Sequence, residues 1–193
     1  MSGRLGVFGG TFDPVHLGHL RAAEVAREAL ALDRILFMPA GKPPHRPAAV
    51  ASALDRYAML ALANAAHPDF VLSDLELRRE GPAYTVDTLE ALQAMSPGSE
   101  LFLIIGSDAF SEISTWREPE RVLQLCTAAV VDRPGASAPF PELPAGARVV
   151  RVARPTLPFS SSEVRRLIKA GQSVRYVVPE AVADYIEKRG LYR

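Results

Sequence analysis

Cysteine is almost absent from this 193-residue chain, in which Cys126 stands alone. A single cysteine cannot form an internal disulfide, so a disulfide-stapled fold is excluded and a reducing, cytoplasmic location is expected. Long uncharged apolar runs are also missing, as is a basic N-terminal segment followed by an apolar one. Neither a membrane span nor a secretion signal is therefore predicted, and no membrane partner is expected.

An excess of charge is lacking too, because 22 basic residues balance 22 acidic ones. Any binding of anions must then depend on local clusters, and no nucleic-acid partner is expected. Hydrophobic residues make up 48% of the chain, which is ordinary for a globular protein. The length suits a single domain over residues 1–193, and no internal repeat is present.

Short apolar runs alternate with helical patterns along the chain. Strands are predicted over residues 5–8, 34–38, 70–72, 100–105, 127–131 and 148–152. Helices are predicted over residues 17–32, 54–65, 86–95, 118–125, 161–170 and 179–188. This alternation predicts an α/β fold, a Rossmann-like doubly wound parallel sheet with helices on both faces and the last two helices packed on it. Ligands bind such sheets at the carboxyl ends of the strands, near the switch point.

The first predicted strand runs into GGTFDPVHLGH, residues 9–19. Gly9 and Gly10 allow a tight turn, and the helix that follows offers unpaired N–H groups to an anion. His16 and His19 are three residues apart and can face the same point. Neither common glycine-rich nucleotide fingerprint is present, which disfavours P-loop hydrolysis and dinucleotide redox chemistry.

From the residues alone, three interpretations of the histidine pair stay open. They are a phosphate site, a pair of capping or packing side chains, and half of a metal site. A zinc site would need further ligands, but Cys126 is single and the other histidines lie in unrelated segments. No metal-ligating set of protein residues is therefore predicted.

Residues 9–19 resemble the T/H-x-G-H signature of the nucleotidyltransferase superfamily, in the form found in bacterial nicotinate-nucleotide adenylyltransferases. The resemblance extends along nearly the whole chain and implies a nucleotidyltransferase-type fold. It implies transfer of the adenylyl group of ATP to nicotinate mononucleotide, giving deamido-NAD and pyrophosphate in NAD biosynthesis. By the same resemblance, one set of residues binds ATP: Gly9, Gly10, Thr11, Phe12, His16, Gly18 and His19.

Two loops extend the resemblance toward the substrate. Residues 41–46, GKPPHR, resemble the family's K-P-P-H-K loop, which implies phosphate contacts from Lys42 and His45. An ordinary solvated basic loop is the alternative interpretation. Residues 83–89, AYTVDTL, resemble S-Y-T-x-D-T-L, which implies that Tyr84 and Thr85 receive the nicotinate carboxylate at a helix start. Alternatively, Thr85 only caps that helix and Tyr84 only packs.

Two more segments complete the resemblance. Gly106 and Asp108, with Trp116 beyond them, resemble the family's G-x-D…W segment. This implies contacts of Asp108 with ribose or with phosphate-bound magnesium, and stacking of Trp116 on the pyridine ring in an otherwise polar loop. A core role is the alternative for a single tryptophan. Residues 159–165, FSSSEVR, resemble I-S-S-T-x-I-R, which implies a second phosphate clamp made by Ser160 and Arg165.

The predicted mechanism needs no protein nucleophile, because positioning and charge stabilisation carry the reaction. The predicted catalytic group is His16, His19, Lys42 and Arg165. Mg²⁺ is expected to be bound through the ATP phosphates. Rival hypotheses are an adenylyltransferase for nicotinamide mononucleotide or phosphopantetheine, a noncatalytic nucleotide-binding regulator and a class I synthetase fragment. The sequence leaves open how strongly the acid is preferred to the amide and whether a homo-oligomer forms.

Overall fold

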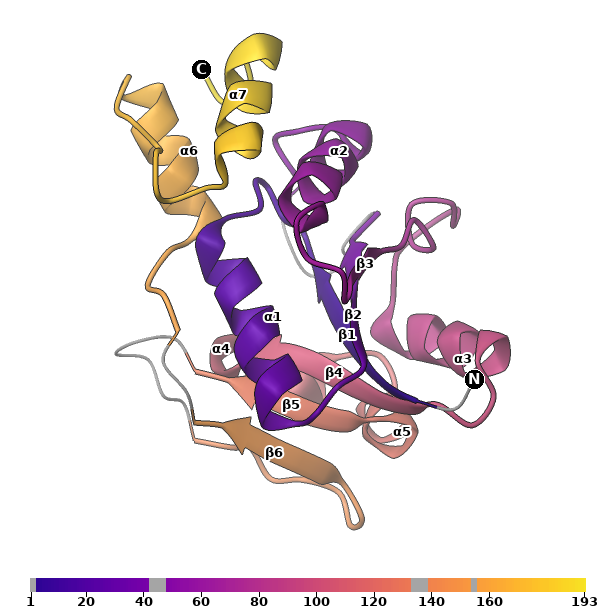
Figure 1. Ribbon diagram of the computed structural model, residues 1–193. Helices are drawn as coiled ribbons and strands as arrows, with labels where there is room; N and C mark the ends of the chain where they lie inside the picture. The colour runs from indigo at the N-terminus through magenta and orange to yellow at the C-terminus, as the bar shows by residue number, and fades with distance from the viewer. Residues whose placement is uncertain (1–2, 42–47, 133–138, 154–155) are drawn as a thin grey trace.

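The computed structural model describes residues 3–41, 48–132, 139–153 and 156–193 (Figure 1). Within these ranges six parallel strands form one sheet in the order β3-β2-β1-β4-β5-β6. The strands are β1 Arg4–Gly10, β2 Arg34–Pro39, β3 Phe70–Leu72, β4 Glu100–Gly106, β5 Thr127–Val131 and β6 Arg148–Val152. The predicted doubly wound parallel sheet is confirmed, and its order reverses between β1 and β4, which places a ligand crevice at their carboxyl ends.

Helices cover both faces of the sheet. They are α1 Leu17–Ala29, α2 Ala53–Asn64, α3 Thr85–Met95, α4 Ser107–Ser111, the 3₁₀ helix η1 Ile113–Thr115, α5 Pro119–Leu125, α6 Ser161–Lys169 and α7 Glu180–Arg189. Helices α1, α2, α6 and α7 lie on one face, and α3, α4 and α5 on the other (Figure 1).

Alternation of side chains along the strands divides the interior into two cores. Phe8 of β1 and Ile104 of β4 face the α1 side, where Val164 and Val182 bring α6 and α7 into the same cluster. Their neighbour Val7 faces the other side, toward α3 and α5. Through this cluster the C-terminal helices share the core on the α1 side, and α7 contacts α2 (Figure 1).

Several predicted helix ends were wrong by a few residues. Helix α1 ends at Ala29 and not at residue 32, because Ala31 takes a left-handed backbone with φ 46°. Helix α5 begins at Pro119, since Glu118 before it is also left-handed. Helix α7 begins at Glu180, so the proline before it is the N-cap and does not lie inside the first turn. Gly190, with φ 62°, ends that helix as predicted.

A larger difference follows β4. Residues 107–115 were expected to form a polar loop, but they form α4 and η1. Phe110 and Ile113 are buried and attach this segment to the core around α3. The helix α3 has Tyr84 as its N-cap, so Thr85 is its first residue and not the predicted cap.

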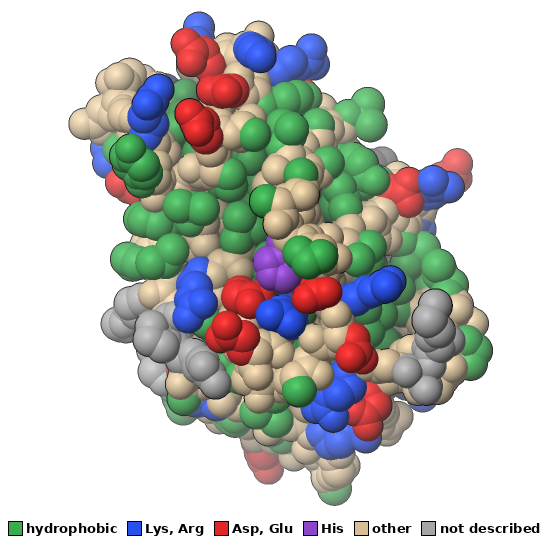
Figure 2. All heavy atoms as spheres, viewed as in Figure 1, with side chains coloured by type: hydrophobic (Ala, Val, Ile, Leu, Met, Phe, Trp, Pro, Cys, Tyr) green, Lys and Arg blue, Asp and Glu red, His purple; other side chains and the backbone are tan. Residues whose placement is uncertain are grey.

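Acidic and basic side chains are interspersed on the face shown in Figure 2, as expected for zero net charge. Arg27 pairs with Glu24 at 2.9 Å and approaches Asp69 at 3.4 Å. No helix in the described ranges is long and apolar enough to cross a membrane.

Candidate active site

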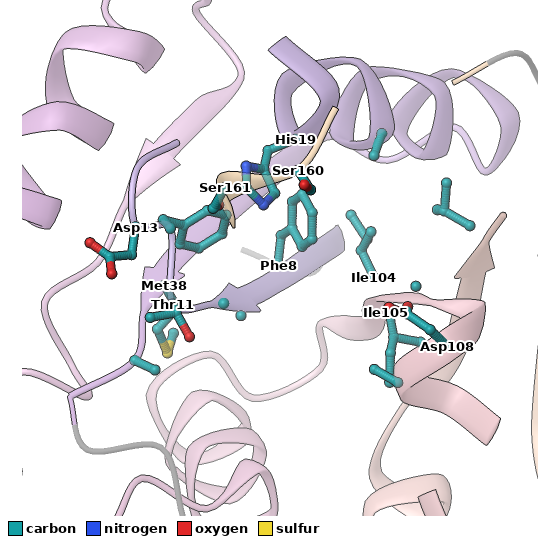
Figure 3. Close-up of a pocket in the computed structure, with 18 of the residues that line it drawn as sticks. Phe8, Thr11, Asp13, His19, Met38, Ile104, Ile105, Asp108, Ser160 and Ser161 are labelled. Carbon is teal, nitrogen blue, oxygen red and sulfur yellow. The ribbon is translucent and has the colours of Figure 1, made fainter. Parts of the chain in front are cut away.

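A cavity of about 800 Å³ opens where the carboxyl ends of β1 and β4 meet the first turns of α1, α3, α4 and α6 (Figure 3). It lies at the predicted switch point. The predicted site residues that line it are Gly9, Gly10, Thr11, Phe12, His16, Gly18, His19, Tyr84, Thr85, Gly106, Asp108, Trp116, Ser160 and Arg165. Lys42 and His45 lie outside the described residues, and so does Arg46. Ala40 and Ala48, on either side of that segment, line the cavity.

The two histidines cap α1 and line the cavity at once. The His16 N–H donates to His19 Nδ1, and the His19 N–H donates to His16 Nδ1, both at 3.3 Å. Their rings stack with centroids 3.7 Å apart. A neutral imidazole whose Nδ1 accepts a hydrogen bond carries its proton on Nε2. The cap therefore fixes the tautomer of both histidines. In each of them Nε2 carries the proton and is a hydrogen-bond donor at the N-terminus of α1.

Glycine is required beside His16. A Cβ on Gly18 would lie 2.9 Å from His16 Nδ1 and 3.3 Å from the Leu157 carbonyl. At the turn, Phe12 has φ 51° and is 2% exposed, with its ring edge-on to Phe8 and His19. The Phe12 side chain thus belongs to the core beneath the turn. If Phe12 contacts ATP, its backbone supplies the contact.

Asp13 is a buried carboxylate that sequence reasoning missed. It is 4% exposed and accepts hydrogen bonds from the N–H groups of Val50 and Ala51, at 2.7 and 3.0 Å, and from the Tyr192 hydroxyl at 2.7 Å. Arg165 Nη1 donates to the Asp13 carbonyl at 2.6 Å. The available signal in the sequence was that Asp13 is a charged residue between apolar neighbours in the motif. Through these bonds Asp13 joins the turn between β1 and α1 to three distant segments of the chain.

Arg56 on α2 was also missed, and it is only 1% exposed. Its guanidinium donates to the carbonyls of Thr11 and Ala40, both at 2.8 Å. Burial lowers the pKa of this guanidinium, and the nearby Asp13 carboxylate opposes that effect. Arg56 therefore holds together the loops that leave β1 and β2, from beneath the cavity.

The first turn of α6 forms another wall of the cavity. Ser160 is the N-cap, and its hydroxyl accepts from the Glu163 N–H at 3.2 Å. The Ser161 hydroxyl donates to the Pro14 carbonyl at 2.9 Å, which ties α6 to the turn before α1. Figure 3 shows both serines in one view with His19. With Arg165, two helix N-termini present positive potential to one cavity.

The α3 side of the cavity is aromatic and partly charged. Arg117 places its guanidinium 4.7 Å from the centroid of the Tyr84 ring, and both residues line the cavity with Trp116. Trp116 also packs against the core around α3, so both of its predicted roles remain compatible with its position. Sequence reasoning missed Arg117, although it directly follows the predicted stacking residue.

Two carboxyl groups enter the cavity wall from different elements. Glu76 is buried and accepts from the Thr88 hydroxyl at 2.9 Å. Burial raises the pKa of Glu76, which favours its neutral form beside the start of α3. Asp108 folds back over the end of β4, where a Cβ on Gly106 would lie 2.5 Å from its Oδ1. No group of three or more His, Cys, Asp or Glu side chains in the described part of the chain could hold a metal ion.

Comparison with known proteins gives one consistent result. A family model described as cytidylyltransferase-like matches residues 7–167. A probable nicotinate-nucleotide adenylyltransferase of Thermus thermophilus is 51% identical over 98% of this chain and 100% of its own length. One from Thermomicrobium roseum is 43% identical over 98% of this chain and 92% of its own.

Solved structures resemble the fold as well. The nicotinic acid mononucleotide adenylyltransferase of Plasmodium falciparum, complexed with NaAD, aligns with a TM-score of 0.80 at 18% identity. The alignment covers 98% of this chain and 97% of that one. The same protein complexed with APC aligns with a TM-score of 0.79. At this identity the likeness supports the fold and no finer property.

Proposed function

Because this chain belongs to the cytidylyltransferase-like family, and within it to the nicotinate-nucleotide adenylyltransferases, we propose that it transfers the adenylyl group of ATP to nicotinate mononucleotide. The products are deamido-NAD and pyrophosphate, in NAD biosynthesis. One observation carries the proposal beyond the family name. Two helix N-termini, the stacked histidines and Arg165 converge on a single cavity at the switch point of the sheet.

In the proposed reaction, a phosphate oxygen of nicotinate mononucleotide attacks the α-phosphorus of ATP. A P–O bond forms to that oxygen while the bond from the α-phosphorus to the bridging oxygen breaks, and pyrophosphate leaves with that electron pair. The positive end of the α1 dipole and the side chains of His16, His19 and Arg165 stabilise the charge that moves onto the phosphate oxygens. From the family resemblance, Lys42 adds to this group, and His45 contacts the phosphate of the substrate.

The protein contributes no nucleophile in this mechanism. Cys126 is buried against α5, where its thiol donates to the Val122 carbonyl at 3.2 Å. Burial raises the pKa of this thiol to about 12, so it stays protonated at neutral pH. A cytoplasmic location is proposed because the chain has a single cysteine and so cannot form an internal disulfide.

Mg²⁺ is proposed to arrive with the ATP phosphates. Such an ion is held mainly by substrate oxygens and water. The ion neutralises phosphate charge when bound. Asp108 is the carboxylate at the cavity wall that the family resemblance assigns to ribose or to this ion.

Preference for the acid over the amide is proposed to arise at the α3 start. The positive end of the α3 dipole at Thr85 and the guanidinium of Arg117 favour a carboxylate over a neutral amide. Trp116 offers a ring face to the pyridine. Burial raises the pKa of Glu76, a shift in the direction that lessens repulsion of an acidic ligand.

Replacing Arg117 by glutamine is expected to raise the KM for nicotinate mononucleotide by about fivefold, a modest change because the guanidinium is half exposed. The KM for nicotinamide mononucleotide should stay unchanged, because the amide carries no charge for Arg117 to attract. Arg121→Gln is the matched control, since Arg121 pairs with Glu90 at 2.9 Å and does not line the cavity. Steady-state kinetics with both mononucleotides measure the effect, and equal changes for acid and amide would contradict it.

Pyrophosphate release tests the proposed function against its rivals. The purified protein is given ATP and Mg²⁺ with nicotinate mononucleotide, nicotinamide mononucleotide or phosphopantetheine. Release is expected to be fast with the acid, slow with the amide and absent with phosphopantetheine. Binding of ATP without any pyrophosphate would favour the regulator hypothesis and overturn the proposal.

Residues 1–193 are proposed to form one nucleotidyltransferase domain. Its support is that α6 and α7 share a core cluster with β1 and β4. ATP and nicotinate mononucleotide are the proposed partners of this domain. Each of these nucleotides is proposed to bind against one of two opposite walls of the cavity.

A further inference from the structure

A tyrosine beyond α7 reaches the turn that precedes α1. Tyr192 is 9% exposed, and its hydroxyl donates to Asp13 Oδ1 at 2.7 Å across 179 residues of sequence. Burial and the bond to Asp13 both raise the pKa of Tyr192, so the hydroxyl stays protonated and remains a donor. This bond links the C-terminal segment to the proposed phosphate site.

Asp13 depends on a small set of donors. Among the described residues, Oδ1 accepts from the Ala51 N–H and the Tyr192 hydroxyl, and Oδ2 accepts from the Val50 N–H. A buried carboxylate is stable only while such donors compensate its charge. Loss of one donor therefore leaves the negative charge of the Asp13 carboxylate less compensated.

The same carboxylate lies beside a proposed catalytic residue. Arg165 Nη1 is 3.8 Å from Asp13 Oδ2, a loose ion pair, while it donates to the Asp13 carbonyl at 2.6 Å. The guanidinium is about one-third exposed and lines the cavity. Asp13 is thus placed to hold Arg165 at the cavity wall or to draw it away.

We propose that Tyr192 is a positioning residue for the adenylyl transfer. Its hydroxyl holds the Asp13 carboxylate, and through Asp13 it holds both the turn before α1 and the Arg165 guanidinium in the geometry that receives the ATP phosphates. Without the hydroxyl, Asp13 compensates its charge by closing the ion pair with Arg165, which withdraws the guanidinium from the triphosphate. This inference rests on the proposed function.

Tyr192→Phe tests the proposal, because it removes the hydroxyl and keeps the ring. Tyr185→Phe is the matched control, since the Tyr185 hydroxyl of α7 donates to Asp55 Oδ1 at 2.9 Å and neither of these two residues lines the cavity. Both variants lose one hydrogen bond to a carboxylate, so similar decreases in Tm are expected. Only Tyr192→Phe is expected to lower kcat/KM for ATP, by about tenfold and mainly through KM, because displacement of a positioning group weakens phosphate contacts.

A double-variant cycle with Asp13→Asn shows whether Tyr192 acts through Asp13. Adding Tyr192→Phe to Asp13→Asn is expected to change the KM for ATP by less than about twofold. If the two substitutions multiplied each other's effect on the KM for ATP, the proposal would be overturned. Equal kinetics in Tyr192→Phe and Tyr185→Phe would also overturn it. A Tyr192→Phe protein that fails to fold while Tyr185→Phe folds would also overturn it, since the bond would then be a folding requirement.

The Kd for ATP, measured by calorimetry, keeps this test separate from the proposed function. If the wild-type protein releases no pyrophosphate, the proposed function fails. Weaker ATP binding in Tyr192→Phe than in Tyr185→Phe would still support the role of Tyr192 in positioning the phosphate site. Equal Kd values in the two variants would contradict it.

Discussion

His19→Ala is expected to reduce the kcat of pyrophosphate release by about 10²- to 10³-fold, the usual loss when one preorganised donor to a developing charge is removed. His19 lines the cavity, and its Nδ1 is already engaged by the His16 N–H. The cap therefore holds the His19 ring in the tautomer whose Nε2 is a donor. Alanine removes both this donor and the ring that stacks on His16.

Alanine also removes half of the helix cap, at a cost of about 1 kcal/mol in the free energy of unfolding. His19→Asn separates the two effects, because an asparagine oxygen can accept from the His16 N–H without restoring the imidazole. The control His67→Ala removes a histidine that stacks on Phe70 and pairs with Glu24 outside the cavity. Full activity in His19→Asn would show that capping is the whole role of His19 and would contradict the proposed chemistry.

Arg165→Met is expected to lower kcat/KM for ATP by about 100-fold, because the proposed charge-assisted contact of Arg165 with the triphosphate is lost. Methionine keeps much of the apolar stem against the turn. The control is Arg166→Met at the next position, where the guanidinium pairs with Glu163 at 2.7 Å and is mostly exposed. Rapid-quench and steady-state kinetics would separate binding from the chemical step. Similar losses in both variants would contradict the role of Arg165.

The strands were predictable because buried parallel strands are continuous apolar runs bounded by polar residues. Residues 100–105, for example, fall within the observed strand β4. Helix α4 was missed because five residues with one buried aromatic, Phe110, show no helical periodicity. Helix ends were misjudged where a left-handed residue such as Ala31 stops the helix, since only some residue types signal that conformation.

The site could be predicted where its signal is local. His16 and His19 are three residues apart, so their shared location followed from helix geometry. The support beneath the site could not be predicted in that way. Arg56 reaches Thr11 across 45 residues, and Tyr192 reaches Asp13 across 179. Such contacts depend on how the sheet and helices pack, which no pattern within one segment encodes.

The most direct test of the proposed adenylyl transfer is to measure which product receives the α-phosphorus of ATP. The protein is incubated with nicotinate mononucleotide, Mg²⁺ and ATP labelled at the α-phosphate, and the nucleotides are separated. The label is expected to enter deamido-NAD in the same molar amount as the pyrophosphate released, and not to enter pyrophosphate. Label recovered as AMP or as unreacted ATP, with no labelled dinucleotide, would contradict it.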